Sequence, residues 1–201
     1  MWNNFLYGIF ISDLVCILDE ESAVSDEYKG AYNCLRDDFS RRNWYGIKNY
    51  CTAFPSLLKE KISNSRNVPI LHELIVFAGR DREHEVVKML ESDQFPREAL
   101  EMRNSSGGTA LTVAAGLGSI VIAKCIVGMN PKLLFIPNDF GLIPLAVSIA
   151  LHLNDMADYL YFVTPLEFWL QENGKYGATL ITKSMEVGNW GKNSMFYPFS
   201  I

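Results

Sequence analysis

The spacing of apolar residues predicts pairs of short helices in the central part of the chain. After Thr109, two runs of apolar residues recur at i, i+3 and i+4 intervals, and the stretch 116–118 separates them. These runs consist of Leu111, Ala114 and Ala115, then Ile122, Ala123, Ile126 and Val127. The stretch 145–161 repeats the arrangement. Because such helix pairs bury their apolar faces only against neighbouring pairs, the pattern indicates a helical repeat.

A turn signature precedes each predicted helix pair. Asn104 and Gly107 open one copy, and Asn138 and Gly141 open the next copy 34 positions later. Glycine suits a tight turn because it adopts positive φ at no steric cost, and asparagine is among the few other residues tolerated there. The same frame reaches backward to Asn64–Asn67 and forward to Gly174–Gly177.

Prolines form a second register that supports the first one. Pro55, Pro96 and Pro131 lie 9, 8 and 7 positions before the asparagines of successive turns. Each proline precedes a leucine-containing stretch that leads into the next turn. The two registers together predict about four repeat units.

The composition is that of a folded protein and argues against polyanionic partners. The chain has 201 residues, of which 49% are hydrophobic and 20% charged, with a net charge of -5. Nucleic acid and anionic lipid attract clustered Lys and Arg, so we expect neither as a partner. The three histidines and four cysteines show no zinc-ligand or disulfide spacing, which favours a reduced, cytoplasmic setting. We expect each cysteine to be a small buried core residue.

The N-terminal stretch is apolar from Phe5 to Leu18 but is too short for a membrane span. It contains Asp13, and no basic residue precedes it as a signal peptide requires. Six acidic residues and no basic residue occupy positions 1–28. We therefore expect an acidic, partly disordered extension over 1–30.

The run from Gly107 to Ala115, with Gly118 after it, resembles the ankyrin motif G-x-T-P-L-H-x-A-A-x-x-x-G. The resemblance implies an all-α fold, an ankyrin-repeat solenoid of stacked helix pairs joined by β-turn or hairpin loops. It also implies that His72, the one histidine in the motif slot, bonds backbone between neighbouring repeats. Ile143 and Pro69 replace the motif threonine, so we expect a less stable stack than a consensus array.

The stretch from Asn43 to Tyr50, followed by Phe54 and Pro55, is similar to the first unit of plant ankyrin proteins associated with accelerated cell death. Those proteins carry a Pro-Gly-Gly (PGG) domain and transmembrane helices after the repeats. The resemblance implies a member truncated before that region, and a membrane association only through the missing C-terminal part.

The two registers give a domain layout. An extension over 1–30 precedes a repeat domain over 31–182, and a tail occupies 191–201. The predicted units span about 31–63, 64–103, 104–137, 138–173 and a partial 174–190.

No catalytic constellation is evident, and we expect no enzyme activity, cofactor, metal or small-molecule substrate. The stretch from Gly116 to Ser119 is better explained as a loop between helices than as a phosphate-binding loop. Glu83, His84 and Glu85 are explained most simply as a solvated helix start. The basic cluster around Arg41 is interrupted by acidic residues and is interpreted as a solvated face.

The expected function is protein binding by a scaffold or adaptor, in which turn tips and the adjoining face of the first helices contact a partner. Phe140 and Tyr176 are the sharper candidates, because an exposed aromatic residue has hot-spot potential. Packing of Phe140 on its own repeat remains the alternative. Plant defence or stress signalling, a membrane-anchored signalling protein at the inner face of the plasma membrane, and an unrecognised enzyme remain further hypotheses. The predicted contact residues are Arg66, Ser105, Ser106, Asp139, Phe140, Lys175 and Tyr176.

Overall fold

The computed structural model of the chain describes residues 26–62, 68–165, 168, 177 and 182. The chain divides into two compact units, Met1–Phe54 and Pro55–Ile201, and each is described by itself. Of the extension predicted over 1–30, residues 1–25 lie outside the described part, and residues 26–30 are helical.

The first unit contains a helix over 26–41 and helix α2, Trp44–Ala53. Between them Arg42 adopts a left-handed conformation with φ 56°, and the Asn43 side chain caps α2 by accepting from the Gly46 N–H at 3.4 Å. The Asp38 side chain lies against Gly46, where it occupies the place that a Cβ atom would take. Ala31, Leu35, Ile47 and Cys51 form the buried part of this unit.

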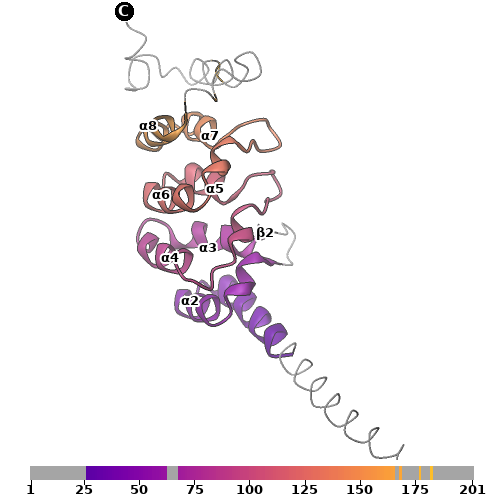
Figure 1. Cartoon of the computed structure of the whole chain (residues 1–201). Helices are drawn as coiled ribbons and strands as arrows, with labels where there is room; N and C mark the ends of the chain where they lie inside the picture. Colours follow the sequence, from indigo (N-terminus) through magenta and orange to yellow (C-terminus); the bar gives the residue numbers. More distant parts are fainter. Residues whose placement is uncertain (1–25, 63–67, 166–167, 169–176, 178–181, 183–201) are drawn as a thin grey trace, which may run out of the picture. The chain divides into compact units, whose positions relative to one another are not determined.

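The second unit is a stack of helix pairs (Figure 1). Each pair is preceded by an extended or turn segment, and a short 3₁₀ helix lies in each connection to the next pair. The elements are η1 Pro55–Lys59, β1 Lys61–Ile62, β2 Val68–Pro69, α3 Ile70–Ala78, α4 Glu83–Leu90, η2 Arg97–Leu100, α5 Ala110–Leu117, α6 Ile120–Met129, η3 Pro131–Phe135, α7 Pro144–Ala150 and α8 Asn154–Val163. The strands β1 and β2 pair antiparallel, with Lys61 opposite Pro69 and Ile62 opposite Val68.

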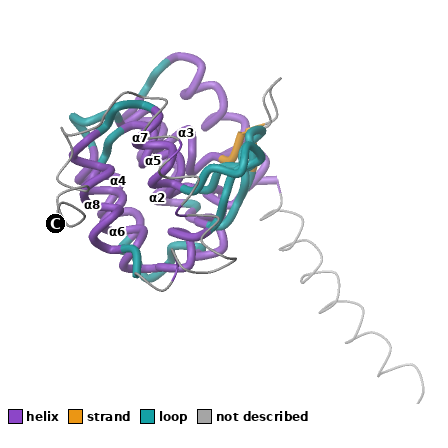
Figure 2. The backbone as a smooth tube through the Cα atoms, turned by 90° about the horizontal axis from the view of Figure 1, so that it is seen from above, coloured by secondary structure: helices purple, strands orange, loops and turns teal. Residues whose placement is uncertain are grey.

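The helices of this unit form two rows, as the view along the stack shows (Figure 2). The first helices α3, α5 and α7 pack on one another, and the second helices α4, α6 and α8 form the other row. Leucine, isoleucine and alanine side chains between the rows are almost fully buried, among them Leu74, Leu111, Ile122 and Leu160. The predicted all-α fold class, with stacked helix pairs joined by hairpin loops, is confirmed.

The proline register coincides with the 3₁₀ helices of the connections. Pro55 and Pro131 are the first residues of η1 and η3, and Pro96 immediately precedes η2. Proline suits these positions because its fixed φ fits a helical first turn and its missing N–H would have no partner there. Asn130 caps η3 by accepting from the Lys132 N–H at 3.2 Å.

The starts of α5 and α7 differ as their sequences imply. At α5 the Thr109 N–H donates to Thr112 Oγ1 at 3.2 Å, and the two hydroxyl oxygens lie 3.3 Å apart. At α7 the corresponding residue is the buried Ile143, which makes no side-chain cap, and Pro144 occupies the first turn. The hydrogen bond expected to be lost at Ile143 is therefore absent from this cap.

The cysteine prediction is only partly correct. Cys51 is buried, which raises the pKa of its thiol to about 12. Cys34 is exposed and Cys125 is half-buried, so the expectation of a buried core residue is wrong for Cys34, whose helix turns this side chain toward solvent. Cys16 lies outside the described residues.

Candidate protein-binding surface

Two of the predicted turns are closed hairpin tips with the same hydrogen bonds. In the tip 104–108, the Asn104 N–H donates to the Gly108 carbonyl and the Gly107 N–H donates to the Asn104 carbonyl, both at 3.0 Å. In the tip 138–142, the Asn138 N–H donates to the Leu142 carbonyl at 3.0 Å. Gly107 and Gly141 have φ of 73° and 74°, which explains the glycine in each copy.

The asparagine side chains hold these tips from within. Asn104 Oδ1 accepts from the N–H groups of Ser106 and Gly108 at 3.0 and 2.9 Å. Asn138 Oδ1 accepts from those of Phe140 and Leu142 at 3.1 and 2.9 Å. An asparagine therefore recurs because its short side chain satisfies two tip donors at once.

Adjacent tips are also joined to each other. The Asp139 N–H donates to the Ser106 carbonyl at 3.0 Å. Arg103 Nη1 donates to the carbonyl oxygens of Gly107 and Pro137, each at 3.1 Å. The two tips thus form one continuous edge, and sequence reasoning missed Arg103 as its bridge.

The predicted contact residues divide into two groups. Ser105, Ser106, Asp139 and Phe140 are exposed on this edge, and Phe140 is 75% exposed, so it does not pack into its own repeat. The other predicted contacts lie outside the described residues and stay predictions: Arg66, Lys175 and Tyr176.

Beyond the tips, α5 and α7 present apolar side chains to solvent. Val113 and Leu117 lie one turn apart on α5, and Val147 and Leu151 occupy the same positions 34 residues later. Leu117 and Leu151 are 37% and 53% exposed, while Val113 and Val147 are half-buried. We call these four residues, with Val76 of α3, the first-helix face.

A glycine brings the parts of this face together. A Cβ atom added to Gly116 would lie 3.6 Å from Leu151 Cδ1 and 3.8 Å from Val147 Cγ1. Val147 of α7 and Leu151, which directly follows α7, therefore lie over the position where α5 has no side chain. Val76, which occupies the equivalent position on α3, is 49% exposed. No residue of α5 or α7 carries a charge, so this part of the surface is uniformly apolar.

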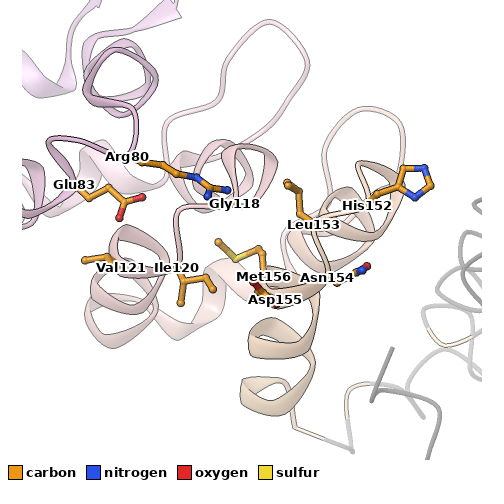
Figure 3. A pocket seen from close by; sticks show the side chains of 10 residues that line it. All are labelled: Arg80, Glu83, Gly118, Ile120, Val121, His152, Leu153, Asn154, Asp155 and Met156. Atoms are coloured by element: carbon orange, nitrogen blue, oxygen red, sulfur yellow. The ribbon is translucent and has the colours of Figure 1, made fainter. Parts of the chain in front are cut away.

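At the opposite end of the first helices, the connections to the second helices enclose a hollow of about 490 Å³ (Figure 3). Arg80 and Glu83 come from the connection between α3 and α4 and from the start of α4. Ile120 and Val121, at the start of α6, form the apolar floor. The other wall is the start of α8, with Asp155 and Met156 among its residues.

The connections beside this hollow use one turn geometry with two different residues. Gly118 has φ 70°, and His152, at the matching position 34 residues later, has φ 58°. In both turns the following residue, Ser119 or Leu153, donates its N–H to a carbonyl five residues back, at 3.1 and 2.9 Å. The imidazole of His152 points away from the other labelled side chains (Figure 3). This residue therefore borders the hollow with its backbone and not with its imidazole.

His72 lies in the core, on the first helix α3. It is 1% exposed, and burial lowers the pKa of its imidazole to about 4. The Met102 backbone acts in the opposite sense and Lys61 adds slightly to the lowering. Neither ring nitrogen has a partner within hydrogen-bond geometry. The partner of the expected bond is therefore the Met102 backbone, in the connection to the next repeat, but the contact falls short of full hydrogen-bond geometry.

Within the described ranges, no group of three His, Cys, Asp or Glu side chains could hold a metal ion. Arg80, Glu83 and Asp155 form no ion pair with any described residue, and the two carboxylates stand on opposite walls of the hollow. Among the helices in the described part of the chain, none has the length and apolar character that a membrane span requires.

No protein-family model matches the chain, and no curated protein matches it either. Among solved structures, a chain in the crystal structure of the yeast ribosomal protein Rps3 in complex with its chaperone Yar1 is similar, with a TM-score of 0.50 and 20% sequence identity. The similarity covers 64% of this chain and 89% of that chain. At this identity the match concerns the fold alone, and it agrees with the predicted all-α solenoid of stacked helix pairs.

The resemblance to the plant accelerated-cell-death subgroup is wrong. It depended on scattered residues around Trp44 and Pro55, and neither a family model nor a curated relative matches the chain. Those residues have a local explanation instead: Asn43 caps α2, and Pro55 opens η1. Defence signalling and a C-terminal membrane anchor rested on this resemblance alone.

Proposed function

We propose that the chain is a non-enzymatic protein-binding module, a scaffold or adaptor. Its partner contacts the edge formed by the two hairpin tips, 104–108 and 138–142, and the first-helix face. The observation that carries this proposal is the exposure of Leu117 and Leu151 on the first-helix face, next to a hydrogen-bonded edge on which Phe140 is exposed. Exposed apolar patches rimmed by polar residues are typical of protein interfaces.

The rigidity of the edge favours binding further. Its tips are held by paired asparagine and backbone hydrogen bonds, so a partner would not have to order them. Exposed aromatic and leucine side chains on a preorganised surface can be desolvated by a partner at little conformational cost. Ser105, Ser106 and Asp139 supply polar contacts around Phe140.

The test compares partners recovered from the source cells by the full chain and by two variants. Leu117→Asn with Leu151→Asn places polar side chains on the first-helix face, and we expect the partner to be lost. Phe162→Asn changes a residue that is 74% exposed on α8, in the other row, and serves as the matched control. Thermal unfolding of each variant checks that the fold is retained. Equal recovery by all three proteins would show that the partner does not use this face.

A further inference from the structure

The hollow lies where the first helices connect to the second helices. It exists because the middle helix pair, α5 and α6, places few side chains in it. Gly118 has no side chain, whereas the preceding connection is longer and carries Arg80 over this position. A Cβ atom on Gly118 would lie 3.5 Å from Arg80 Nη2 and 3.3 Å from Leu153 Cδ2. The start of α6 therefore forms the bottom of a space whose walls are the starts of α4 and α8 (Figure 3).

Two carboxylates face this space from opposite walls. Glu83 is the first residue of α4, and Asp155 lies in the first turn of α8. Figure 3 shows the Glu83 carboxylate directed over Ile120 and Val121, away from its own helix. No described residue forms an ion pair with either carboxylate.

The chemistry of the lining selects the sign of an occupant. Two carboxylates outnumber the Arg80 guanidinium, and the His152 imidazole points outward, so an anion would meet net repulsion. The floor of Ile120 and Val121 is apolar, as is Met156 on the α8 wall, and these side chains suit a chain of methylene groups. A long aliphatic side chain that ends in a cation matches both parts.

The hollow also adjoins the first-helix face. Leu117 directly precedes Gly118, and Leu151 directly precedes His152. The first-helix face therefore ends where the hollow begins. A partner segment that covers Leu117 and Leu151 of the first-helix face would reach Glu83 and Asp155 with its next residues. Arg80 on the rim could then donate to a backbone carbonyl of the same segment.

From these contacts we infer that the hollow between Glu83 and Asp155 receives a lysine or arginine side chain of the protein partner. This inference rests on the proposed function and adds the chemistry of the partner: apolar residues for the first-helix face, followed by a basic residue for the hollow. The binding is salt-dependent, because the charges that attract the basic residue are partly solvated.

The experiment selects peptides from a displayed random library on the full chain and measures the affinity of the enriched peptides. Glu83→Gln with Asp155→Asn removes the two charges with little change of shape, and we expect affinity to fall roughly five- to thirtyfold. Glu91→Gln with Asp93→Asn removes the same charge beside a different hollow of about 300 Å³ and should leave affinity unchanged. Replacing the basic residue of the peptide by norleucine should weaken binding to wild type but not to the Glu83/Asp155 variant.

The outcomes separate the inference from the function. The inference is supported if the affinity losses from norleucine in the peptide and from Glu83→Gln with Asp155→Asn in the chain are not additive. Peptides that bind equally well to the Glu83/Asp155 variant, yet lose affinity for Leu117→Asn with Leu151→Asn, overturn it and leave the proposed function standing. If no library peptide binds the chain, both the inference and the peptide-binding form of the function are rejected.

Discussion

The backbone N–H of Asp139 donates a hydrogen bond to the Ser106 carbonyl at 3.0 Å, which joins two hairpin tips that belong to successive helix pairs. This contact places the side chains of Asp139 and Phe140 at a set position relative to Ser105 and Ser106. A surface built from separate turns is thereby presented as one edge, and the edge depends on small local features of each tip.

The two tip glycines should differ in their tolerance of a side chain. Gly141→Ala imposes a left-handed conformation on alanine in open space, and we expect a loss of about 1 kcal/mol in the free energy of unfolding. Gly107→Ala imposes the same strain and also drives a Cβ atom into the side chain and backbone of Asp139, so its loss should be at least about 2 kcal/mol. Urea denaturation measures both, and equal losses would show that the tips are not coupled at Gly107.

The side chain of Asn104 should stabilise its tip through two accepted hydrogen bonds. Asn104→Ala leaves the Ser106 and Gly108 N–H groups without this acceptor, and we expect a loss of about 1–2 kcal/mol in unfolding free energy. Asn104→Asp keeps an acceptor oxygen at the same place and should lose much less. If both variants lose the same amount, the stabilisation does not come from the acceptor. Urea denaturation of the two variants side by side makes the comparison.

Burial of His72 predicts a specific dependence of stability on pH. The pKa of its imidazole is about 4 in the folded chain and about 6.5 when unfolded, so the unfolded chain takes up the proton first as pH falls. The free energy of unfolding has its full value, as far as His72 is concerned, above about pH 6.5. It falls by about 3 kcal/mol as the pH approaches about 4. His72→Gln should remove this part of the pH dependence.

Comparison of wild type and His72→Gln across that pH range isolates the contribution of His72, because every other side chain is the same in both proteins. His84→Gln, at an exposed histidine of α4, is the control and should follow the wild-type curve. A wild-type curve parallel to that of His72→Gln would contradict the burial argument.

His152 and Gly118 invite exchange, because they share one left-handed turn position. His152→Gly relieves the strain of a side chain at φ 58°, and since the imidazole points away from the hollow, little contact is lost. We expect unfolding free energy to rise by up to about 1 kcal/mol. Gly118→Ala places a Cβ atom 3.3 Å from Leu153 and should destabilise the chain. Thermal unfolding tests both signs, and a His152→Gly variant that is less stable than wild type would refute the strain argument.

The sequence was sufficient for features that depend on neighbouring residues. The helix pairs follow from apolar spacing, and the tips at Asn104 and Asn138 follow from turn chemistry. The proline register marked the connections between pairs, and the structure showed that they contain 3₁₀ helices. These features are local because a few consecutive residues satisfy their own hydrogen bonds or dihedral preferences. The domain boundaries assigned from the same registers remain predictions, as do the contacts assigned to Arg66, Lys175 and Tyr176.

Sequence similarity spread over scattered residues was a poorer guide. The subgroup resemblance around Trp44 and Pro55 failed, since caps and 3₁₀ turns account for those residues without common descent from that subgroup. His72 fits its motif slot and the Met102 backbone of the next connection acts on its ring, yet neither ring nitrogen reaches full hydrogen-bond geometry.

What the sequence by itself determined is the repeating unit: its helices, its tips and the exposed position of Phe140's turn. Only the tertiary structure decided which side chains of different units meet. Leu117 and Leu151 look like ordinary helix residues until stacking of α5 on α7 places Leu151 over Gly116, the residue before Leu117, with both leucines exposed on an uncharged face. Glu83 and Asp155 are 72 positions apart, and the space between them exists because Gly118 and the start of α6 leave it open. Such juxtapositions depend on packing between repeats, which no local pattern of residues records.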